Sequence, residues 1–130
     1  MNPLRASHLR RLAGVALLLL ALAPLHGCGR AQAPQSLPTM QIQVAGRRIE
    51  VEVALTPAQR AKGMMHRRKI APDEGMLFVY PYDARIPFYM RNTYVPLSIA
   101  FLTSGGVVLN IEEMKPLTEH YHHPLVECRY

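Results

Sequence analysis

The residues most able to form a binding site stand in the segment 88–93, which reads FYMRNT. Its two aromatic rings and the thioether of Met90 are apolar, whereas Asn92 and Thr93 carry an amide and a hydroxyl group. Small-molecule pockets combine a mostly apolar lining with a few polar groups that orient the ligand. The segment therefore predicts a small-molecule site. The alternative is that the rings and Met90 pack in the core and that Asn92 and Thr93 close a turn.

Histidines are concentrated near the C-terminus, at His120, His122 and His123. Together with methionine thioethers they could bind copper(I), which prefers soft ligands. Metal handling in the periplasm is therefore an alternative function. However, adjacent histidines of a strand point to opposite faces, so the sequence favours solvated histidines in a loop and assigns no metal site.

Catalytic residues are not evident. Asp73 and Glu74 are neighbours, so their side chains diverge and do not form an acid–base pair. Cys128 resembles a thiol nucleophile only through the histidines near it, and no phosphate-binding loop or zinc spacing is present. We expect a protein that is not an enzyme and has no cofactor. An unrecognised hydrolase is the remaining alternative.

The N-terminus has the pattern of a signal peptide, with a basic start, an apolar run at residues 12–23 and a cysteine at position 28. Twelve apolar residues are too few to span a bilayer, which takes roughly 20. The sequence before Cys28 resembles the lipobox of bacterial lipoproteins. We therefore predict a signal peptide at 1–27, lipidation of Cys28 and a flexible tether at 28–39. The alternative is a soluble periplasmic or secreted product.

This leader changes how the charge is interpreted. The whole chain has a formal net charge of +6, but from residue 34 onward there are 11 basic and 9 acidic residues. A nearly balanced domain makes nucleic acid an improbable partner. The predicted partners are a membrane, through the lipid, and a small molecule. If Cys28 carries lipid, Cys128 has no intramolecular disulfide partner. The oligomeric state is not indicated.

Short strands dominate the rest of the chain. Alternation at 41–44 and 49–53, around a turn at Gly46, predicts an antiparallel hairpin. Further strands are expected at 75–80, at 86–90, and on both sides of Ser-Gly-Gly at 104–106. The one confident helix runs from Pro57 to about Lys62, because Thr56 and Gln59 form a capping box and Gly63 can end it. The predicted fold is mainly β, a small β-sandwich or open barrel of short antiparallel strands with one short helix, over residues 40–130.

Four separated motifs resemble the domain of unknown function 192 family, which is common in bacteria and archaea. They lie in order within residues 41–118, at 53–57, 63–67, 75–78 and 88–97. Two differences from the family pattern are Ser98, where an aspartate is usual, and a shortened C-terminus. A missing last strand would leave an unpaired edge or an opened core. The resemblance implies a compact β-rich domain and no established activity.

We therefore predict an accessory or small-molecule-binding domain anchored in the cell envelope. The basic run at 66–69 is more typical of a solvent-exposed turn than of an anion-binding site. Arg67 is its best candidate for a ligand contact, because it lies within the second motif. The predicted ligand-binding residues are Met65, Arg67, Met90, Asn92 and Thr93. Resemblance to Gram-negative lipoproteins, with Gly29 after the cysteine, implies the outer membrane.

Overall fold

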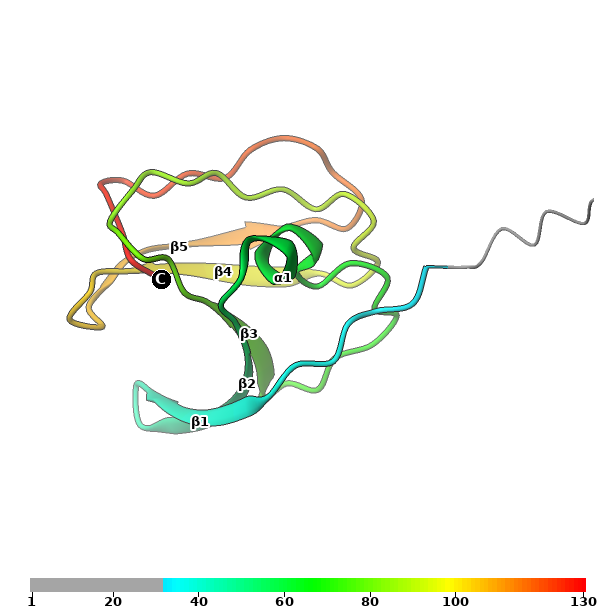
Figure 1. Cartoon of the computed structure of the whole chain (residues 1–130), viewed down its shortest axis with the longest axis horizontal. Helices are drawn as coiled ribbons and strands as arrows, with labels where there is room; N and C mark the ends of the chain where they lie inside the picture. The colour runs from blue at the N-terminus through cyan, green and yellow to red at the C-terminus, as the bar shows by residue number, and fades with distance from the viewer. Residues whose placement is uncertain (1–31) are drawn as a thin grey trace, which may run out of the picture. The chain divides into compact units, whose positions relative to one another are not determined.

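The structure is a computed structural model that describes residues 32–130 (Figure 1). The predicted signal peptide and Cys28 lie outside the described residues. Within residues 32–130, no helix is long and apolar enough to cross a membrane. The elements follow one another in the order β1-β2-α1-β3-β4-β5.

The first sheet begins with the predicted hairpin. β1 (Thr39–Val44) pairs antiparallel with β2 (Arg47–Ala54). Ala45 and Gly46, between them, have φ values of 48° and 81°. Two consecutive left-handed residues are typical of the tight turns that match the twist of a hairpin. The hairpin prediction is confirmed.

The helix prediction is also confirmed, since α1 spans Pro57–Lys62. The hydroxyl of Thr56 accepts the backbone N–H of Gln59 at 3.2 Å, and the side chain of Gln59 accepts that of Thr56 at 2.9 Å. These reciprocal bonds satisfy donors that the first turn of a helix cannot pair. Gly63 ends the helix with a φ of 47°.

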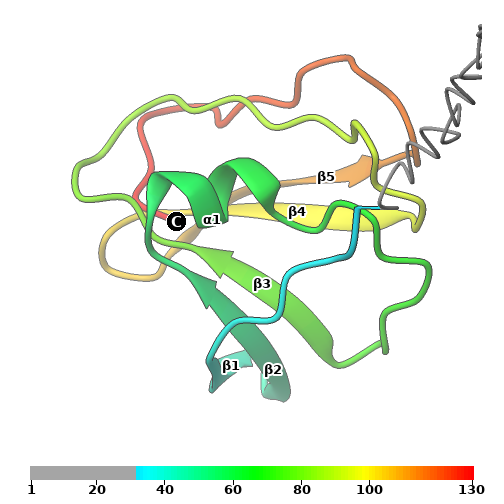
Figure 2. The same cartoon turned by 45° about the vertical axis from the view of Figure 1, so that its right-hand side comes forward.

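One strand pairing differs from the antiparallel arrangement that was expected. β3 (Glu74–Phe78) lies beside β2 and runs parallel to it, so the first sheet has the order β1-β2-β3. The reason is the connection between them. α1 and the loop after it carry the chain back to the beginning of β2, as a crossover between parallel strands must. Figure 2 shows α1 between these strands and the upper part of the domain.

The second sheet is a hairpin of β4 (Leu97–Leu102) and β5 (Val108–Met114), which confirms the strands predicted around residues 104–106. The strand expected at 86–90 is not formed. That part of the chain makes isolated bridges instead, between Ala84 and Cys128 and between Phe88 and His122. Pro87 lacks the N–H that a continuous ladder would need there.

The core lies between the two sheets and contains an aromatic row. The ring of Phe88 packs edge-on against Phe78 at 4.9 Å between centroids and against Phe101 at 5.9 Å. Phe101 and Met90 are the largest side chains that are fully buried. The fold is thus mainly β, a small open sandwich with one short helix, as predicted. No strand of the first sheet is paired with one of the second within residues 32–130.

Candidate functional site

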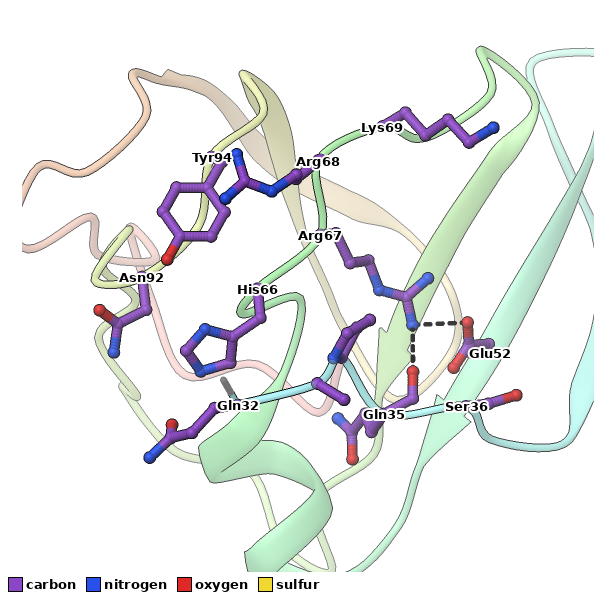
Figure 3. A pocket seen from close by; sticks show the side chains of 12 residues that line it. Gln32, Gln35, Ser36, Glu52, His66, Arg67, Arg68, Lys69, Asn92 and Tyr94 are labelled. Carbon is purple, nitrogen blue, oxygen red and sulfur yellow. Dashed lines mark hydrogen bonds and ion pairs between the residues drawn. The ribbon is translucent and has the colours of Figure 1, made fainter. Parts of the chain in front are cut away.

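A polar pocket of about 1030 Å³ lies where four segments meet (Figure 3). The loop after α1 contributes the basic run at residues 66–69. The turn before β4 contributes Asn92 and Tyr94, β2 contributes Glu52, and residues 32–36 form a further wall. Polar and charged side chains therefore dominate one continuous recess, which is large enough for a metabolite-sized molecule.

Arg67 is held in the wall of this pocket by two acceptors. One terminal guanidinium nitrogen donates to the carboxylate of Glu52 at 2.6 Å and to the backbone oxygen of Gln35 at 3.0 Å. The side chains of Arg67 and Glu52 are only 15% and 14% exposed. The buried Nε of Arg67 has no hydrogen-bond partner among residues 32–130. Arg67 is therefore positioned by the protein through its terminal nitrogen, while its Nε is a buried donor without a partner in this part of the chain.

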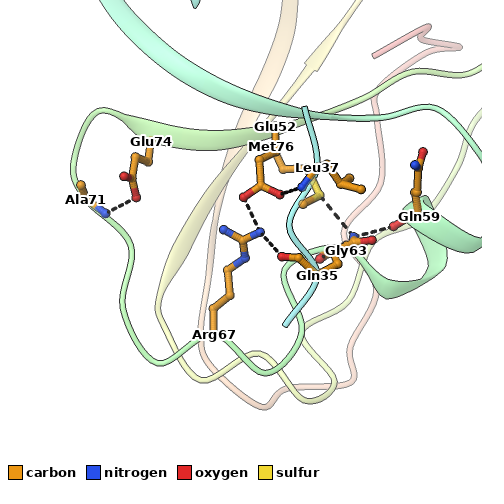
Figure 4. A network of polar contacts seen from close by, with 9 residues as sticks. All are labelled: Gln35, Leu37, Glu52, Gln59, Gly63, Arg67, Ala71, Glu74 and Met76. Atoms are coloured by element: carbon orange, nitrogen blue, oxygen red, sulfur yellow. Dashed lines mark hydrogen bonds and ion pairs between the residues drawn. The ribbon is translucent and has the colours of Figure 1, made fainter. Parts of the chain in front are cut away.

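Residues 32–38, part of the predicted tether, lie against the domain (Figure 4). The amide of Gln35 donates to the backbone oxygens of Gln59 and Gly63, at 2.8 and 2.9 Å, and so satisfies carbonyls at the end of α1. The N–H of Leu37 donates to Glu52 at 2.8 Å. Glu52 thus connects Arg67 to this segment, which forms one side of the pocket.

The backbone of the pocket is locally strained. His66 and Asn92 are not glycine, yet their φ values are 68° and 56°. The N–H of His66 donates to the oxygen of Asn92 at 2.7 Å, which joins the two turns. The backbone of residues other than glycine rarely adopts the left-handed conformation, and the residues that do so are concentrated at functional sites. Both residues line the pocket.

An aromatic ring and two cations form the outer rim. The guanidinium of Arg68 lies over the ring of Tyr94, 5.1 Å from its centroid, and the ring of His66 is 6.3 Å from the same centroid. Arg68 and Lys69 form no ion pair within residues 32–130. Because Glu52 offsets the charge of Arg67, the uncompensated positive charge of the pocket comes from Arg68 and Lys69.

The structure does not bring the five predicted site residues into one pocket. Arg67 and Asn92 line the polar pocket, whereas Met65, Met90 and Thr93 line a second, mostly apolar cavity. Met90 and Thr93 are 1% and 4% exposed. Met90 belongs to the core, and the N–H of Thr93 donates to the oxygen of Met90 in the turn that presents Asn92. The alternative interpretation, core and turn, describes these two residues.

The second cavity has a volume of about 580 Å³ and lies between the two sheets. Side chains from all five strands and from α1 line it. Its apolar members include Ile49, Val51, Leu77, Ile99, Phe101 and Met114. The interior of the open sandwich is thus incompletely filled.

The histidine segment does not form a metal site among the described residues. No group of three or more histidine, cysteine, aspartate and glutamate side chains within residues 32–130 is placed to hold a metal ion. His120 and His123 are exposed, as expected of a loop. His122 differs, since it is 3% exposed and its Nδ1 lies 2.7 Å from a carboxylate oxygen of Glu112.

Cys128 is a buried free thiol whose sulfur lies 3.6 Å from the backbone oxygen of Ala84. Burial raises the pKa of this thiol, and the nearby carboxylate of Asp83 raises it further. A higher pKa lowers the fraction of reactive thiolate. The environment of Cys128 therefore does not favour a nucleophilic role.

Sequence reasoning missed several residues of the polar pocket. The basic run at 66–69 is evident in the sequence, but such a run is also typical of an ordinary solvent-exposed turn. Gln35 and Glu52 gave no signal, because their contacts join segments that are distant in the sequence. Tyr94 could have been found from its place two residues after Asn92.

Comparison with known proteins gives a family and two solved structures. The family model DUF192, described as Uncharacterized ACR, matches residues 40–130. The structure of a candidate transcription regulator from Sinorhizobium meliloti 1021 is 36% identical, with a TM-score of 0.64, over 71% of this chain and 74% of that one. A protein of unknown function from Novosphingobium aromaticivorans DSM 12444 is 29% identical, with a TM-score of 0.63, over 76% and 78%. The search of curated proteins found no match.

Proposed function

The chain belongs to the domain of unknown function 192 family, whose function is uncharacterised, and we propose that its polar pocket binds a small anionic ligand. The observation that carries this proposal is the convergence of Arg67, Arg68 and Lys69 on one recess that holds a single carboxylate, Glu52. An arginine or lysine that faces an anion forms charge-assisted hydrogen bonds, which are stronger than neutral ones.

The other lining groups suit the recognition of an organic anion. The ring of Tyr94 offers an apolar face, and the amide of Asn92 offers both a donor and an acceptor. The guanidinium of Arg67 is already fixed in place by Glu52 and Gln35. Fixed donors lose little freedom on binding, which favours affinity. No catalytic role is assigned to these residues.

Replacement of Arg68 tests the proposal, since it removes charge from the rim without breaking an ion pair. We expect Arg68→Ala to weaken the binding of citrate or inorganic phosphate about tenfold, as the loss of one charge-assisted bond would. Isothermal titration of the full chain in detergent measures this. Arg48→Ala is the matched control, because Arg48 is exposed on β2 and does not line the pocket.

Two results would contradict anion binding. One is the absence of any heat or thermal stabilisation with citrate and phosphate. The other is equal affinity in the Arg68 and Arg48 variants, which would assign the effect to general charge. Glucose serves as the neutral probe, and binding of glucose alone would indicate a pocket for uncharged ligands instead.

We also propose that the domain is exported and anchored by a lipid on Cys28, facing the periplasm from the outer membrane. The support is the pattern of the leader, a basic start and a short apolar run before Cys28. Cys28→Ser is expected to move the protein from the membrane fraction to the soluble fraction and to remove the mass of the lipid. A Cys28→Ser protein that stays with the membrane would contradict lipid anchoring, and Cys128→Ser is the control.

The structural neighbour from Sinorhizobium meliloti does not change this proposal. Its name concerns transcription, and contact with DNA normally uses a strongly basic surface. From residue 34 onward this chain has 11 basic and 9 acidic residues, and Glu52 already compensates one of the basic side chains in the pocket. We therefore propose a small molecule, and not nucleic acid, as the ligand.

A further inference from the structure

The segment that leads into the domain is fixed along one side of the polar pocket. Gln35 anchors this segment, because its amide bonds two carbonyl groups at the end of α1 and its backbone oxygen accepts Arg67 at 3.0 Å. Gln32, three residues earlier, also lines the pocket. Residues 32–38 of the predicted tether are therefore in contact with the domain and form part of its binding site.

This contact limits the distance between the pocket and the proposed lipid on Cys28. Cys28 and Gln32 are four positions apart in the sequence. Four residues span at most about 14 Å when fully extended, which is less than two Debye lengths at physiological ionic strength. A lipid on Cys28 would thus keep the wall of the pocket within the electrostatic field of an anionic membrane surface.

The rim of the pocket offers several donors for a phosphate group. Arg68 and Lys69 are exposed, and neither forms an ion pair within residues 32–130. In the same range, the backbone N–H groups of these two residues have no acceptor on another backbone group. Arginine and lysine bind phosphate through charge-assisted hydrogen bonds. Both the side chains and the backbone of this turn are therefore available to a phosphate.

Apolar side chains lie beside these cations. Tyr94 and Leu117 are 40% and 58% exposed, and the N–H of Leu117 donates to the oxygen of Thr93, the residue before Tyr94, at 3.1 Å. Lys115 is exposed in the same turn after β5. Both views of the domain show this turn, the loop after α1 and residues 32–36 at one end of it (Figure 1, Figure 2).

A surface of this composition suits a membrane better than a free anion. Tyrosine, exposed apolar side chains and cations together are typical of proteins that contact the headgroup layer of a bilayer. Free phosphate would pair with the cations, but it would leave the apolar side chain of Leu117 in water. A phospholipid offers a phosphate for the cations and hydrocarbon for Leu117 and Tyr94.

We propose that the rim of the polar pocket, formed by Arg68, Lys69 and Tyr94, binds the headgroup of an anionic phospholipid in the membrane that anchors the chain. Arg68 and Lys69 contact the phosphate, while Tyr94 and Leu117 lie at the boundary between headgroups and acyl chains. This ligand is a specific case of the anion binding proposed for the pocket, on which it rests.

Amide hydrogen exchange of the full chain, reconstituted in vesicles, tests the contact. The vesicles consist of phosphatidylcholine alone or of phosphatidylcholine with phosphatidylglycerol, which adds net negative charge. We expect phosphatidylglycerol to slow exchange at residues 68, 69 and 94 about tenfold, since each cation near an anionic surface adds to the affinity. Arg68→Ala with Lys69→Ala should abolish this slowing. Arg47→Ala with Arg48→Ala is the matched control, because both residues are exposed on β2 and neither lines the pocket.

Three results would overturn the proposal: exchange that does not respond to phosphatidylglycerol, equal slowing in the two kinds of vesicle, and equal loss of the slowing in both double variants. Titration of the full chain in detergent with inorganic phosphate separates this failure from that of anion binding. If phosphate still binds there, only the lipid assignment is wrong. If phosphate does not bind either, the anion pocket is wrong as well.

Discussion

Replacement of Phe101 by alanine is expected to lower the free energy of unfolding by about 3–5 kcal/mol, the range for truncating a buried aromatic residue. Phe101 is 1% exposed, and its ring packs edge-on against Phe88, which in turn packs against Phe78. Removing it opens the centre of this row. Small domains are stable by about 5–15 kcal/mol, so a large share of that stability would be lost.

Urea denaturation followed by circular dichroism measures this loss. Phe101→Leu keeps most of the volume and should cost less than about 1.5 kcal/mol. Val107→Ala, at a residue that is 64% exposed, should change stability by less than about 0.5 kcal/mol. A loss below about 1.5 kcal/mol for Phe101→Ala would show that Phe101 is not central to the core.

The elements that the sequence predicts well are those with local causes. The hairpin of β1 and β2 follows from strict alternation around a turn at Gly46. The helix follows from Thr56, Pro57 and Gln59, whose capping contacts span only a few residues. Each of these signals is complete within one short segment, so distant contacts have little chance to override it.

The elements that the sequence predicts poorly depend on distant contacts. The orientation of β3 is fixed by the path of residues 55–73, and strand patterns contain no information about such a path. The segment 86–90 has the composition of a strand, but only Phe88 finds a bridging partner there, His122. Pairing over such a separation depends on how the intervening chain packs, which an apolar pattern does not encode.

The candidate site likewise combines local features, which the sequence predicts, with distant contacts, which it does not. The basic run at 66–69 is visible in the sequence, as is the turn at Asn92. Their convergence is not, because it depends on a bond between the backbone of His66 and that of Asn92. Alternation in β2 places Glu50 and Glu52 together on the face that is expected to be exposed to solvent. Only Glu50 is exposed, since Arg67 and Leu37 cover Glu52.

Glu52 is for this reason the residue whose replacement should affect both stability and the pocket. We expect Glu52→Ala to lower the free energy of unfolding by about 3 kcal/mol, the lower end of the range for breaking a buried ion pair. The variant leaves the guanidinium of Arg67, which is 15% exposed, without its carboxylate. It also leaves the N–H of Leu37 without its acceptor, so residues 32–38 should exchange their amide hydrogens faster.

A double variant separates the unpaired charge from the lost packing. Replacing both partners, in Glu52→Leu with Arg67→Leu, should cost clearly less than Glu52→Ala, because no charge is then buried alone. Glu113→Ala is the matched control. Glu113 is exposed, and within residues 32–130 its side chain bonds only the hydroxyl of Ser98, so its loss should cost less than about 0.5 kcal/mol. If Glu52→Ala were no more destabilising than Glu113→Ala, the Arg67–Glu52 pair would not stabilise the wall of the pocket. Arg67 would then not be held in position by Glu52.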